Sequence, residues 1–459
     1  MTKEKSILIR WGTVVSDQSA SRQDVLIRGD TIVAVGDLSD IKADRMIDAS
    51  GLLVLPGGVD THVHFNDEFM GTVSVHDFYT GTLAAAYGGT TSVIDFSNQW
   101  PGGTLKEALD KKHNEADGQA LVDWGVHPVI TQPTPDTLNE IPLVVEHGAP
   151  TIKCYMTYRE EGIMTEARDL KKILARLRDS GGMLMIHAED NDMAEDNIPC
   201  LIAEGKTQAI YHARSKPPEC EERAIGQGIA MARETGGRLF IVHLASDKGM
   251  RMIAEARAQG VDVLAETCTH YLVFTEEYLE REDGIKWICS PPLRSKAIQD
   301  ELWKGLQDGR IRQVSSDDAA YSWEAKLMGK DRFDRCPNGI PGIETRLPVL
   351  YSQGVATGRI SLSRFVGLIS TQPARLFGLY PKKGCLAPGS DADVVLFDPE
   401  AEWRLNATSL HMATDWSAFD DTKIKGKVVK VFSRGELIVD GETCLAEKGR
   451  GRYLHRRLA

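Results

Sequence analysis

Two histidines separated by a single residue are the feature of this sequence that most directly suggests chemistry. Residues 60–64 read Asp-Thr-His-Val-His and follow the turn Pro56-Gly57-Gly58. On an extended strand, residues two positions apart point to the same side, so His62 and His64 can present two imidazoles to one ion. The same pair is compatible with two ordinary core or surface histidines. Alone, it marks only a candidate metal site.

Four further polar residues lie inside apolar runs or close after them: Lys153, His187, His243 and Asp317. Buried polar groups need partners, and a metal ion supplies them. If the runs are parallel strands that end at one face, these four side chains converge with the histidine pair. Such a set is hard to explain as packing and predicts a metal centre.

The runs themselves predict the scaffold. The apolar runs are residues 52–55, 91–96, 122–130, 151–156, 183–188, 239–244, 261–265 and 311–315. Helical patterns lie between them, including residues 105–116, 166–179, 219–235 and 248–258. Continuous apolar runs are typical of parallel strands covered on both faces. Eight strand–helix units predict an α/β fold, a TIM (β/α)8 barrel, in which active sites form at the carboxyl ends of the strands.

The two ends of the chain have a different pattern. Short β-rich segments with hairpin turns occur near both termini, at residues 6–15, 24–28, 31–35, 392–397, 428–433 and 436–439. These segments predict one small β-sandwich built from both chain ends. The expected organisation is a sandwich of residues 1–55 and 385–440, a barrel of residues 56–384 and a C-terminal tail of residues 441–459.

Composition narrows the class of protein. The 459 residues carry 54 basic and 66 acidic side chains, a net charge of −12, which argues against broad binding to nucleic acid or to an anionic membrane. No apolar run approaches the roughly 20 residues of a membrane span, and the N-terminal segment is too weakly apolar for a signal peptide. The eight cysteines include no C-x-x-C pair. A cytoplasmic enzyme without disulfides is expected.

Lysine is an unusual metal ligand because its ammonium repels cations. A desolvated lysine loses its proton more easily, and the neutral amine can react with CO2 to give an anionic carbamate whose two oxygens can bridge two metals. The alternative for Lys153 is a core lysine in a salt bridge. The neighbouring histidines favour the carbamate.

Several motifs in order give the chain a clear resemblance. They are residues 57–64 (Gly-Gly-Val-Asp-Thr-His-Val-His), 88–91 (Gly-Gly-Thr-Thr), 186–189 (Ile-His-Ala-Glu), 290–294 (Ser-Pro-Pro-Leu-Arg), 337–344 (Pro-Asn-Gly-Ile-Pro-Gly-Ile-Glu) and 389–393 (Gly-Ser-Asp-Ala-Asp). The chain resembles the dihydropyrimidinase/hydantoinase family of the amidohydrolase superfamily from about residue 5 to its end. That family combines a TIM barrel with a sandwich made from both chain ends.

The resemblance implies two divalent metal ions, usually zinc, and a hydroxide that bridges them. The ligands fall into two groups that share carboxylated Lys153: His62, His64 and Asp317 on one metal, and His187 and His243 on the other. A homotetramer is also implied.

The resemblance further implies the substrate-handling residues. Tyr158 follows Lys153 at the family's spacing of five and would polarise the substrate carbonyl, while Ser290 and Asn338 match positions that hold the cyclic amide. Asp317 would pass a proton to the leaving nitrogen. The implied reaction opens the ring amide of dihydropyrimidines or 5-substituted hydantoins to N-carbamoyl amino acids.

Three alternatives remain at this point. Dihydroorotase-like proteins carry H-x-H-x-R, but position 66 is Asn66. Allantoinases and other cyclic imide or ureide hydrolases share similar motifs, but are not expected to keep Tyr158. A non-enzymatic scaffold resembling the collapsin response mediator proteins would have lost metal ligands, and none is missing here. The chain departs from the family at Asp318, where a histidine is usual, which puts the hydrogen bonding beside Asp317 in question.

Overall fold

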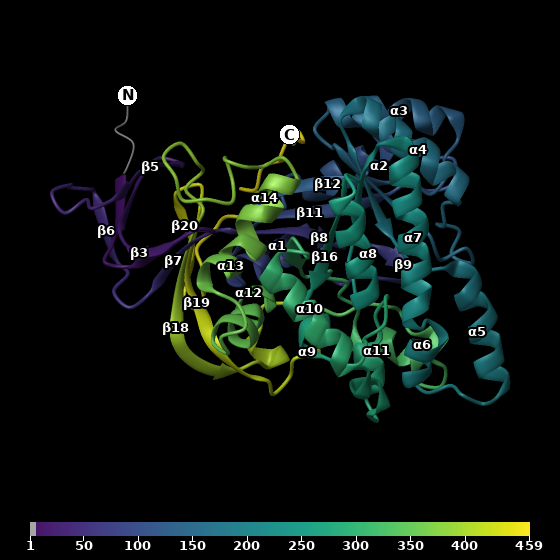
Figure 1. The fold of residues 1–459 in the computed structure, drawn as a ribbon. Coiled ribbons are helices and arrows are strands. Elements are labelled where there is room, and N and C mark those ends of the chain that lie inside the picture. Colours follow the sequence, from purple (N-terminus) through teal and green to yellow (C-terminus); the bar gives the residue numbers. More distant parts are fainter. Residues whose placement is uncertain (1–5) are drawn as a thin grey trace.

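Eight parallel strands form the centre of the molecule in the computed structural model, which describes residues 6–459 (Figure 1). In sheet order they are β8 (Gly58–Val63), β11 (Thr90–Asn98), β12 (Asp123–Val129), β13 (Thr151–Tyr155), β14 (Met183–His187), β15 (Arg238–Ile241), β16 (Val263–Cys268) and β17 (Gln313–Ser315). The first and last strands approach each other through a parallel bridge between Val63 and Asp318. The sheet is therefore a nearly closed barrel, as predicted.

The first strand of the barrel differs from the prediction. The run at residues 52–55 forms β7 (Leu53–Pro56), which pairs with strands of an outer sheet rather than with the barrel. The first barrel strand is β8, which begins two residues later. It was not found as an apolar run because Asp60, Thr61 and His62 are polar, although all three are fully buried. The chain passes between the sheets at Gly57, where a Cβ would lie 2.1 Å from Thr91 Oγ1.

Helices cover the outside of the barrel (Figure 1). The longer ones are α1 (Phe78–Tyr87), α2 (Leu105–Ala116), α3 (Pro135–Glu146), α4 (Ala167–Ser180), α5 (Asn191–Ala203), α7 (Pro218–Thr235), α8 (Asp247–Ala258) and α10 (Lys296–Asp308). Helix α4 shows why they form: Leu170, Ile173, Leu174 and Leu177 recur at helical spacing and are buried, and the helix ends at Gly181 in the left-handed conformation. Among the described residues, no helix is long and apolar enough to cross a membrane.

Two antiparallel-rich sheets stand beside the barrel, and both chain ends contribute to them (Figure 1). One sheet contains β1 (Ser6–Arg10), β4 (Asp24–Arg28), β5 (Thr31–Gly36) and β6 (Arg45–Asp48). The other contains β2 (Thr13–Val15), β3 (Ala20–Arg22), β7, β18 (Val394–Arg404), β19 (Lys423–Ser433), β20 (Glu436–Asp440) and β21 (Thr443–Cys444). Ile9 and Val25 from the first share one apolar cluster with Val394 and Phe432 from the second. The predicted union of both chain ends is confirmed, whereas residues 1–5 lie outside the described part.

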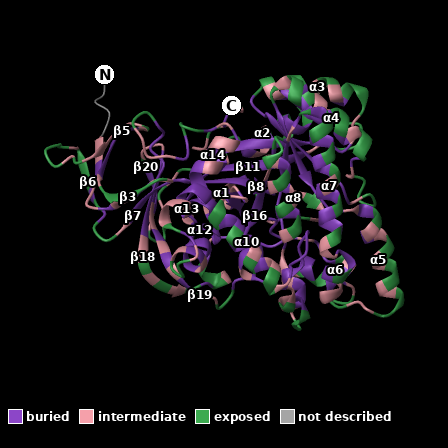
Figure 2. Cartoon of the chain, in the orientation of Figure 1, coloured by how far each residue is buried: buried purple, intermediate pink, exposed green. Residues whose placement is uncertain are grey.

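The last residues return to the barrel. Leu454 N donates to Trp124 O at 2.6 Å, and fully buried Arg456 donates to Thr151 Oγ1 at 3.0 Å and to Val126 O at 2.5 Å. These contacts lie in the first half of β12 and at the start of β13. The carboxyl ends of the strands lie on the opposite side. The barrel strands are buried, whereas the surrounding helices have exposed stretches (Figure 2).

Candidate active site

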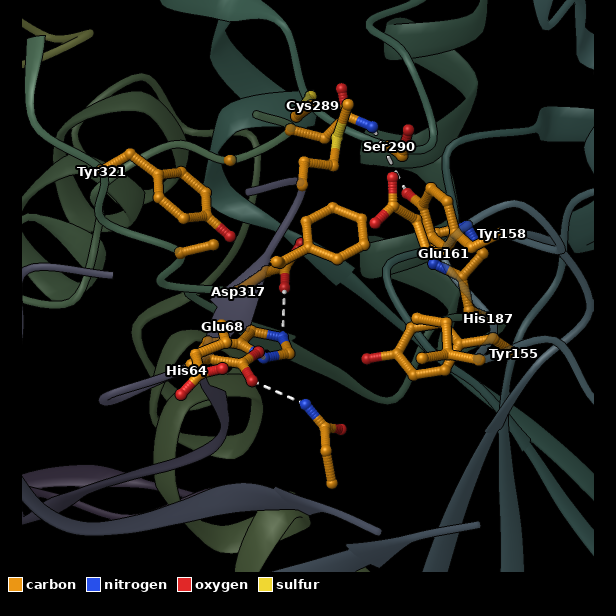
Figure 3. Close-up of a pocket in the computed structure, with 18 of the residues that line it drawn as sticks. His64, Glu68, Tyr155, Tyr158, Glu161, His187, Cys289, Ser290, Asp317 and Tyr321 are labelled. Atoms are coloured by element: carbon orange, nitrogen blue, oxygen red, sulfur yellow. Dashed lines mark hydrogen bonds and ion pairs between the residues drawn. The ribbon is translucent and has the colours of Figure 1, made fainter. Parts of the chain in front are cut away.

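A cavity of about 440 Å³ opens at the carboxyl ends of the barrel strands (Figure 3). Its lining includes every residue that the sequence indicated for the site: His62, His64, Lys153, Tyr158, His187, His243, Ser290, Asp317 and Asn338. Their convergence follows from the topology, because parallel strands end at one face of the barrel. Their individual roles stay predictions.

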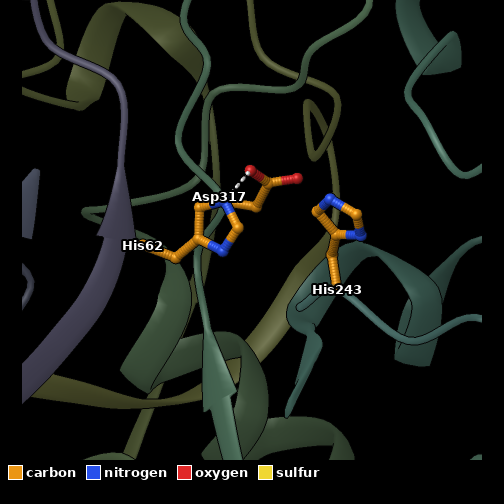
Figure 4. Close-up of side chains that lie close together, drawn as sticks. All are labelled: His62, His243 and Asp317. Atoms are coloured by element: carbon orange, nitrogen blue, oxygen red, sulfur yellow. Dashed lines mark ion pairs between the residues drawn. The ribbon is translucent and has the colours of Figure 1, made fainter. Parts of the chain in front are cut away.

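His62 is oriented by contacts at both ring nitrogens. Nδ1 lies 2.5 Å from Glu266 Oε1 on β16, and Nε2 lies 3.0 Å from Asp317 Oδ1. The hydrogen bond at Nδ1 leaves Nε2 as the nitrogen that can bind a metal. His62, His243 and Asp317 each offer one ligand atom, and these atoms lie within 4.8 Å of one another (Figure 4).

His64, two residues after His62, contacts the same Asp317 carboxylate. Its Nε2 lies 3.5 Å from Asp317 Oδ1 and its Nδ1 lies 2.9 Å from Asp67 Oδ2. Burial opposes the charged imidazole, but the hydrogen bonds to Asp317 and Asp67 outweigh it and raise the pKa of His64 to about 9. The two carboxylates thus contact both ring nitrogens of His64 and fix its orientation.

His187 and His243 form the other side of the group. Their ring centroids lie 4.4 Å apart, and His187 Nε2 lies 2.7 Å from Glu189 Oε2. Burial lowers the pKa of His187 to about 4, despite the hydrogen bond to Glu189, and holds the pKa of His243 well below its ordinary value. Both imidazoles are neutral at physiological pH, which is the form that binds metals.

Lys153 lies at the floor of the cavity on β13 and is 1% exposed. Its Nζ lies 5.0 Å from the ring centroid of Phe96 and 4.9 Å from that of Tyr155. Within the described residues this ammonium forms no ion pair. Burial lowers the pKa of Lys153 to about 8, so a useful fraction of the amine is neutral near pH 7 and can react with CO2.

The donor set fits divalent metals. The buried atom His243 Nδ1 has no hydrogen-bond partner, which is costly for an imidazole nitrogen unless another group binds there. Imidazole nitrogen and carboxylate oxygen are the ligands that zinc takes in catalytic sites. The residues present therefore match a divalent metal centre.

Three residues of the site adopt a backbone conformation that side chains disfavour. Tyr158, His243 and Asp317 have φ angles of 68°, 38° and 50°. Each such left-handed residue costs on the order of 1–3 kcal/mol. Such conformations persist where the surrounding structure determines them and are common in catalytic sites. Here they turn the chain immediately after the strands, so that the side chains face the cavity.

Comparison with known proteins decides the family. The model of the amidohydrolase family matches residues 53–438. The chain is 42% identical to the D-phenylhydantoinase of Escherichia coli O1:K1 / APEC over 98% of each chain, and 39% identical to the D-hydantoinase of Geobacillus stearothermophilus over 98% of this chain and 96% of the relative. The crystal structure of dihydropyrimidinase from Brevibacillus agri NCHU1002 is 40% identical, covers 99% of each chain and superimposes with a TM-score of 0.96.

The chain belongs to the amidohydrolase family, among its hydantoinases and dihydropyrimidinases. The resemblance inferred from the motifs is confirmed, as is the fold. The scaffold alternative without enzymatic activity loses its support, because the relatives named above are all enzymes and no ligand position of this chain is substituted.

One wall of the cavity in this hydantoinase-family chain is lined by Tyr158, Asn338 and Ser290. Asn338 Nδ2 donates to Tyr158 Oη at 3.5 Å, and Ser290 is buried beside them. Burial raises the pKa of Tyr158, although Lys216 acts in the opposite direction. The phenol is therefore protonated at neutral pH and can donate a hydrogen bond.

A short hairpin covers part of the cavity mouth. It consists of β9 (Glu68–Phe69) and β10 (Thr72–Val73), joined through Met70 and Gly71. The ring of Phe69 meets that of Tyr158 edge to face, with centroids 4.9 Å apart. The hairpin thus places an apolar side chain next to the residue predicted to hold the substrate carbonyl.

Asp318, the departure from the family pattern, turns away from the cavity. Its Oδ2 lies 2.7 Å from His76 Nδ1, and its Oδ1 accepts from the backbone N–H groups of Gly342 and Ile343 at 2.7 and 3.1 Å. The pKa of this carboxyl is lowered: burial alone would raise it, but His76 and the two N–H groups prevail. Asp318 therefore joins three segments behind Asp317, and His76, which had no predicted role, is its partner.

The thiols near the site are not nucleophiles. Burial raises the pKa of Cys154 and Cys289 to about 12 and that of Cys268 well above its ordinary value. The reactive form of cysteine is the thiolate, which these environments suppress. All three cysteines are buried, as expected of packing residues.

Several site residues were not predicted from the sequence. Glu189 and Asp67 follow their histidines by two and three positions, so local spacing could have indicated them. Glu266 lies 204 positions from His62, and Lys216 lies 27 positions from Glu189 and 74 from Ser290. No local pattern identifies them, because only the closed barrel brings these strands together.

Proposed function

We propose that this protein opens the ring amide of dihydropyrimidines and 5-substituted hydantoins by hydrolysis and releases N-carbamoyl amino acids. The observation that carries the proposal is the convergence of four histidines, Asp317 and Lys153 beneath the Tyr158 phenol in one cavity. The names of the hydantoinase and dihydropyrimidinase relatives support the same reaction.

Two divalent ions, which we propose to be zinc, would be held by two ligand groups that share carboxylated Lys153: His62, His64 and Asp317, and His187 and His243. When bound, they lower the pKa of water so that hydroxide is available near neutral pH, and they polarise the carbonyl. The low pKa of Lys153 supports its carboxylation.

The side chains of the protein supply the remaining steps. Tyr158 donates a hydrogen bond to the carbonyl oxygen and stabilises the negative charge that develops there. Asp317 is ionised at neutral pH, because its buried carboxylate is held by His62 and His64, and its pKa lies well below the usual range. The Asp317 carboxylate receives the proton of the attacking water-derived nucleophile and delivers it to the ring nitrogen as the C–N bond breaks. Ser290 and Asn338 hold the rest of the ring.

The cavity also suggests which substituents are accepted. Phe69 and Met70 from the hairpin line its mouth, and no arginine lines it among the described residues. An apolar substituent at ring position 5 is therefore favoured, whereas the carboxylate of dihydroorotate has no arginine partner. We propose a preference for D enantiomers, which rests on the names of the D-hydantoinase and D-phenylhydantoinase relatives. The family resemblance also supports a homotetramer, which light scattering can test.

The test is a steady-state comparison on metal-replete enzyme. Dihydrouracil, D- and L-5-phenylhydantoin, allantoin and dihydroorotate would be assayed under one condition. We expect the highest kcat/KM for dihydrouracil or D-5-phenylhydantoin. Turnover of allantoin or dihydroorotate at least about ten times faster than every hydantoin and dihydropyrimidine would replace the proposed substrate class by the alternative ureide hydrolases, since a tenfold ratio corresponds to about 1.4 kcal/mol of transition-state preference.

A further inference from the structure

One buried ammonium connects both halves of the candidate site. Lys216 lies between α6 (Ile210–Ser215) and α7 and is 5% exposed. Its Nζ donates to Glu189 Oε2 at 3.1 Å and to Ser290 Oγ at 2.9 Å, and it lies 5.0 Å from the ring centroid of Tyr158. It does not line the main cavity; it lines a smaller one of about 150 Å³ behind Tyr158. Lys216 therefore acts on the site through other residues.

The first partner links Lys216 to a candidate metal ligand. Glu189 is fully buried, and its Oε2 also forms a hydrogen bond with His187 Nε2 at 2.7 Å. That hydrogen bond leaves Nδ1 as the ring nitrogen available to a metal. The ammonium of Lys216 and the imidazole of His187 therefore share one buried carboxylate oxygen, which fixes the two side chains relative to each other.

The other two partners face the substrate. Ser290 Oγ accepts from Lys216, so its hydroxyl hydrogen is directed elsewhere, and Tyr158 presents its ring to the ammonium while its hydroxyl meets Asn338. A cation near a phenol stabilises negative charge on the phenol oxygen. It thereby makes the hydroxyl a stronger donor as charge develops on the carbonyl it binds.

We propose that Lys216 is a positioning residue for the ring-opening reaction. Its ammonium fixes the Ser290 hydroxyl and the Tyr158 ring against the Glu189–His187 pair, and so sets the direction and strength of the hydrogen bond that Tyr158 donates. The proposal rests on the proposed function. A purely structural partner of Glu189 would instead act on folding and metal retention.

A double-mutant cycle between Lys216 and Tyr158 separates these roles. On metal-replete enzyme, Lys216→Met should lower kcat about 30-fold with KM within about threefold, because the affected hydrogen bond matters mainly in the transition state. In the Tyr158→Phe background the same change should cost less than about threefold, since interacting residues are non-additive. Lys216→Arg, which keeps the charge, should recover most of kcat.

Three results would overturn the proposal. The first is an equal fall in kcat in the parent and Tyr158→Phe backgrounds. The second is a rise in KM with kcat unchanged. The third is a loss of metal from Lys216→Met, measured by elemental analysis. If Lys216→Met folds poorly because Glu189 loses its partner, the double variant Lys216→Met/Glu189→Gln removes both charges. Glu189→Gln then replaces the parent enzyme as the reference of the cycle.

The matched control is Lys383, a buried lysine paired with Asp123 and Asp393 at the other end of the barrel. Lys383→Met should leave kcat of the folded enzyme unchanged.

A crystal structure of Lys216→Met tests the positioning role of Lys216 independently of catalytic activity. We expect the Ser290 side chain to change rotamer and Tyr158 Oη to leave Asn338 Nδ2. Unchanged positions of both groups would overturn the positioning role. A parent enzyme that is inactive on every cyclic ureide would instead refute the proposed function, and the structural comparison would still judge Lys216.

Discussion

Three candidate metal-binding histidines are each oriented by a carboxylate. Glu266 binds His62, Asp67 binds His64 and Glu189 binds His187. Such partners fix the ring orientation and increase the basicity of the imidazole. The histidines themselves could be recognised from their types and positions, because H-x-H and strand ends are local patterns. The partner of His62 could not, because it comes from a strand that is distant in sequence.

Tyr158→Phe should lower kcat by about 10²–10³ while the metal content stays at the parent level. The lost hydroxyl is the proposed donor to the carbonyl oxygen, and removing one such donor typically costs that much. Steady-state kinetics with elemental analysis of the same preparation checks this. A kcat within about threefold of the parent would assign Tyr158 to packing against Phe69.

Lys153→Ala should abolish both metal binding and activity. The amine is buried among the predicted ligands, and its pKa of about 8 favours the neutral form that reacts with CO2. Short carboxylic acids supplied to the variant should restore part of both properties, because they can replace the carbamate oxygens. A variant that keeps its metals and full turnover would show that Lys153 is not a ligand.

At the scale of elements, the pattern of apolar runs identified β11 to β17 but not β8. The first barrel strand carries Asp60, whose buried carboxylate pairs with the guanidinium of buried Arg346 at 3.2 Å, so the barrel interior accommodates a charged residue on this strand. A search for continuous apolar runs misses such a strand, although the H-x-H pattern indicated its extended conformation. The hairpin at the cavity mouth could not be predicted, because strands of two residues have no sequence period.

Phe69→Ala tests the hairpin as a determinant of the substituent. We expect kcat/KM for D-5-phenylhydantoin to fall about tenfold, since burying an aromatic group contributes on the order of 1–3 kcal/mol. The value for dihydrouracil, which has no substituent, should change less than about threefold and serves as the control. Equal losses on both substrates would contradict a role in substituent recognition.

The segment that contains α6 should also impose a pH dependence on stability. His212 Nε2 lies 2.8 Å from Cys289 O, and burial lowers the pKa of His212 to about 3 from 6.5. The unfolded chain therefore binds an additional proton below pH 6.5, and stability falls as the pH drops from 6.5 towards 3. At pH 5 the loss through this group is about 2 kcal/mol.

His212→Gln should remove that contribution while it keeps a donor to the Cys289 carbonyl. The drop in melting temperature between pH 8 and pH 5, measured by calorimetry, should be smaller in the variant than in the parent. An identical drop in both proteins would show that His212 is not the titrating group.

At the scale of the whole molecule, the composition of the chain ends was enough to predict that they pair beside a barrel. The two sheets and their shared apolar cluster agree with that prediction. The return of the last residues to the barrel could not be predicted, because Arg456 is a charged residue in a polar, basic segment and nothing local indicates its burial. Its two acceptors, Val126 O on β12 and Thr151 Oγ1 on β13, come together only in the assembled barrel.

The C-terminal segment should therefore stabilise the barrel without taking part in the reaction. Arg456 is fully buried and donates to Thr151 on β13 and to Val126 on β12, at the end of the barrel opposite the cavity. Arg456→Met leaves both acceptors without this donor, and buried unsatisfied groups cost about 1–3 kcal/mol each. We expect a lower melting temperature with kcat per metal-loaded chain unchanged. Arg452→Met is the control, since Arg452 is 66% exposed and its ion pair with Asp30 spans 3.8 Å; exposed pairs of this kind contribute little. A melting temperature equal to that of the parent in Arg456→Met, or a fall in kcat without loss of stability, would contradict a purely stabilising role for the segment.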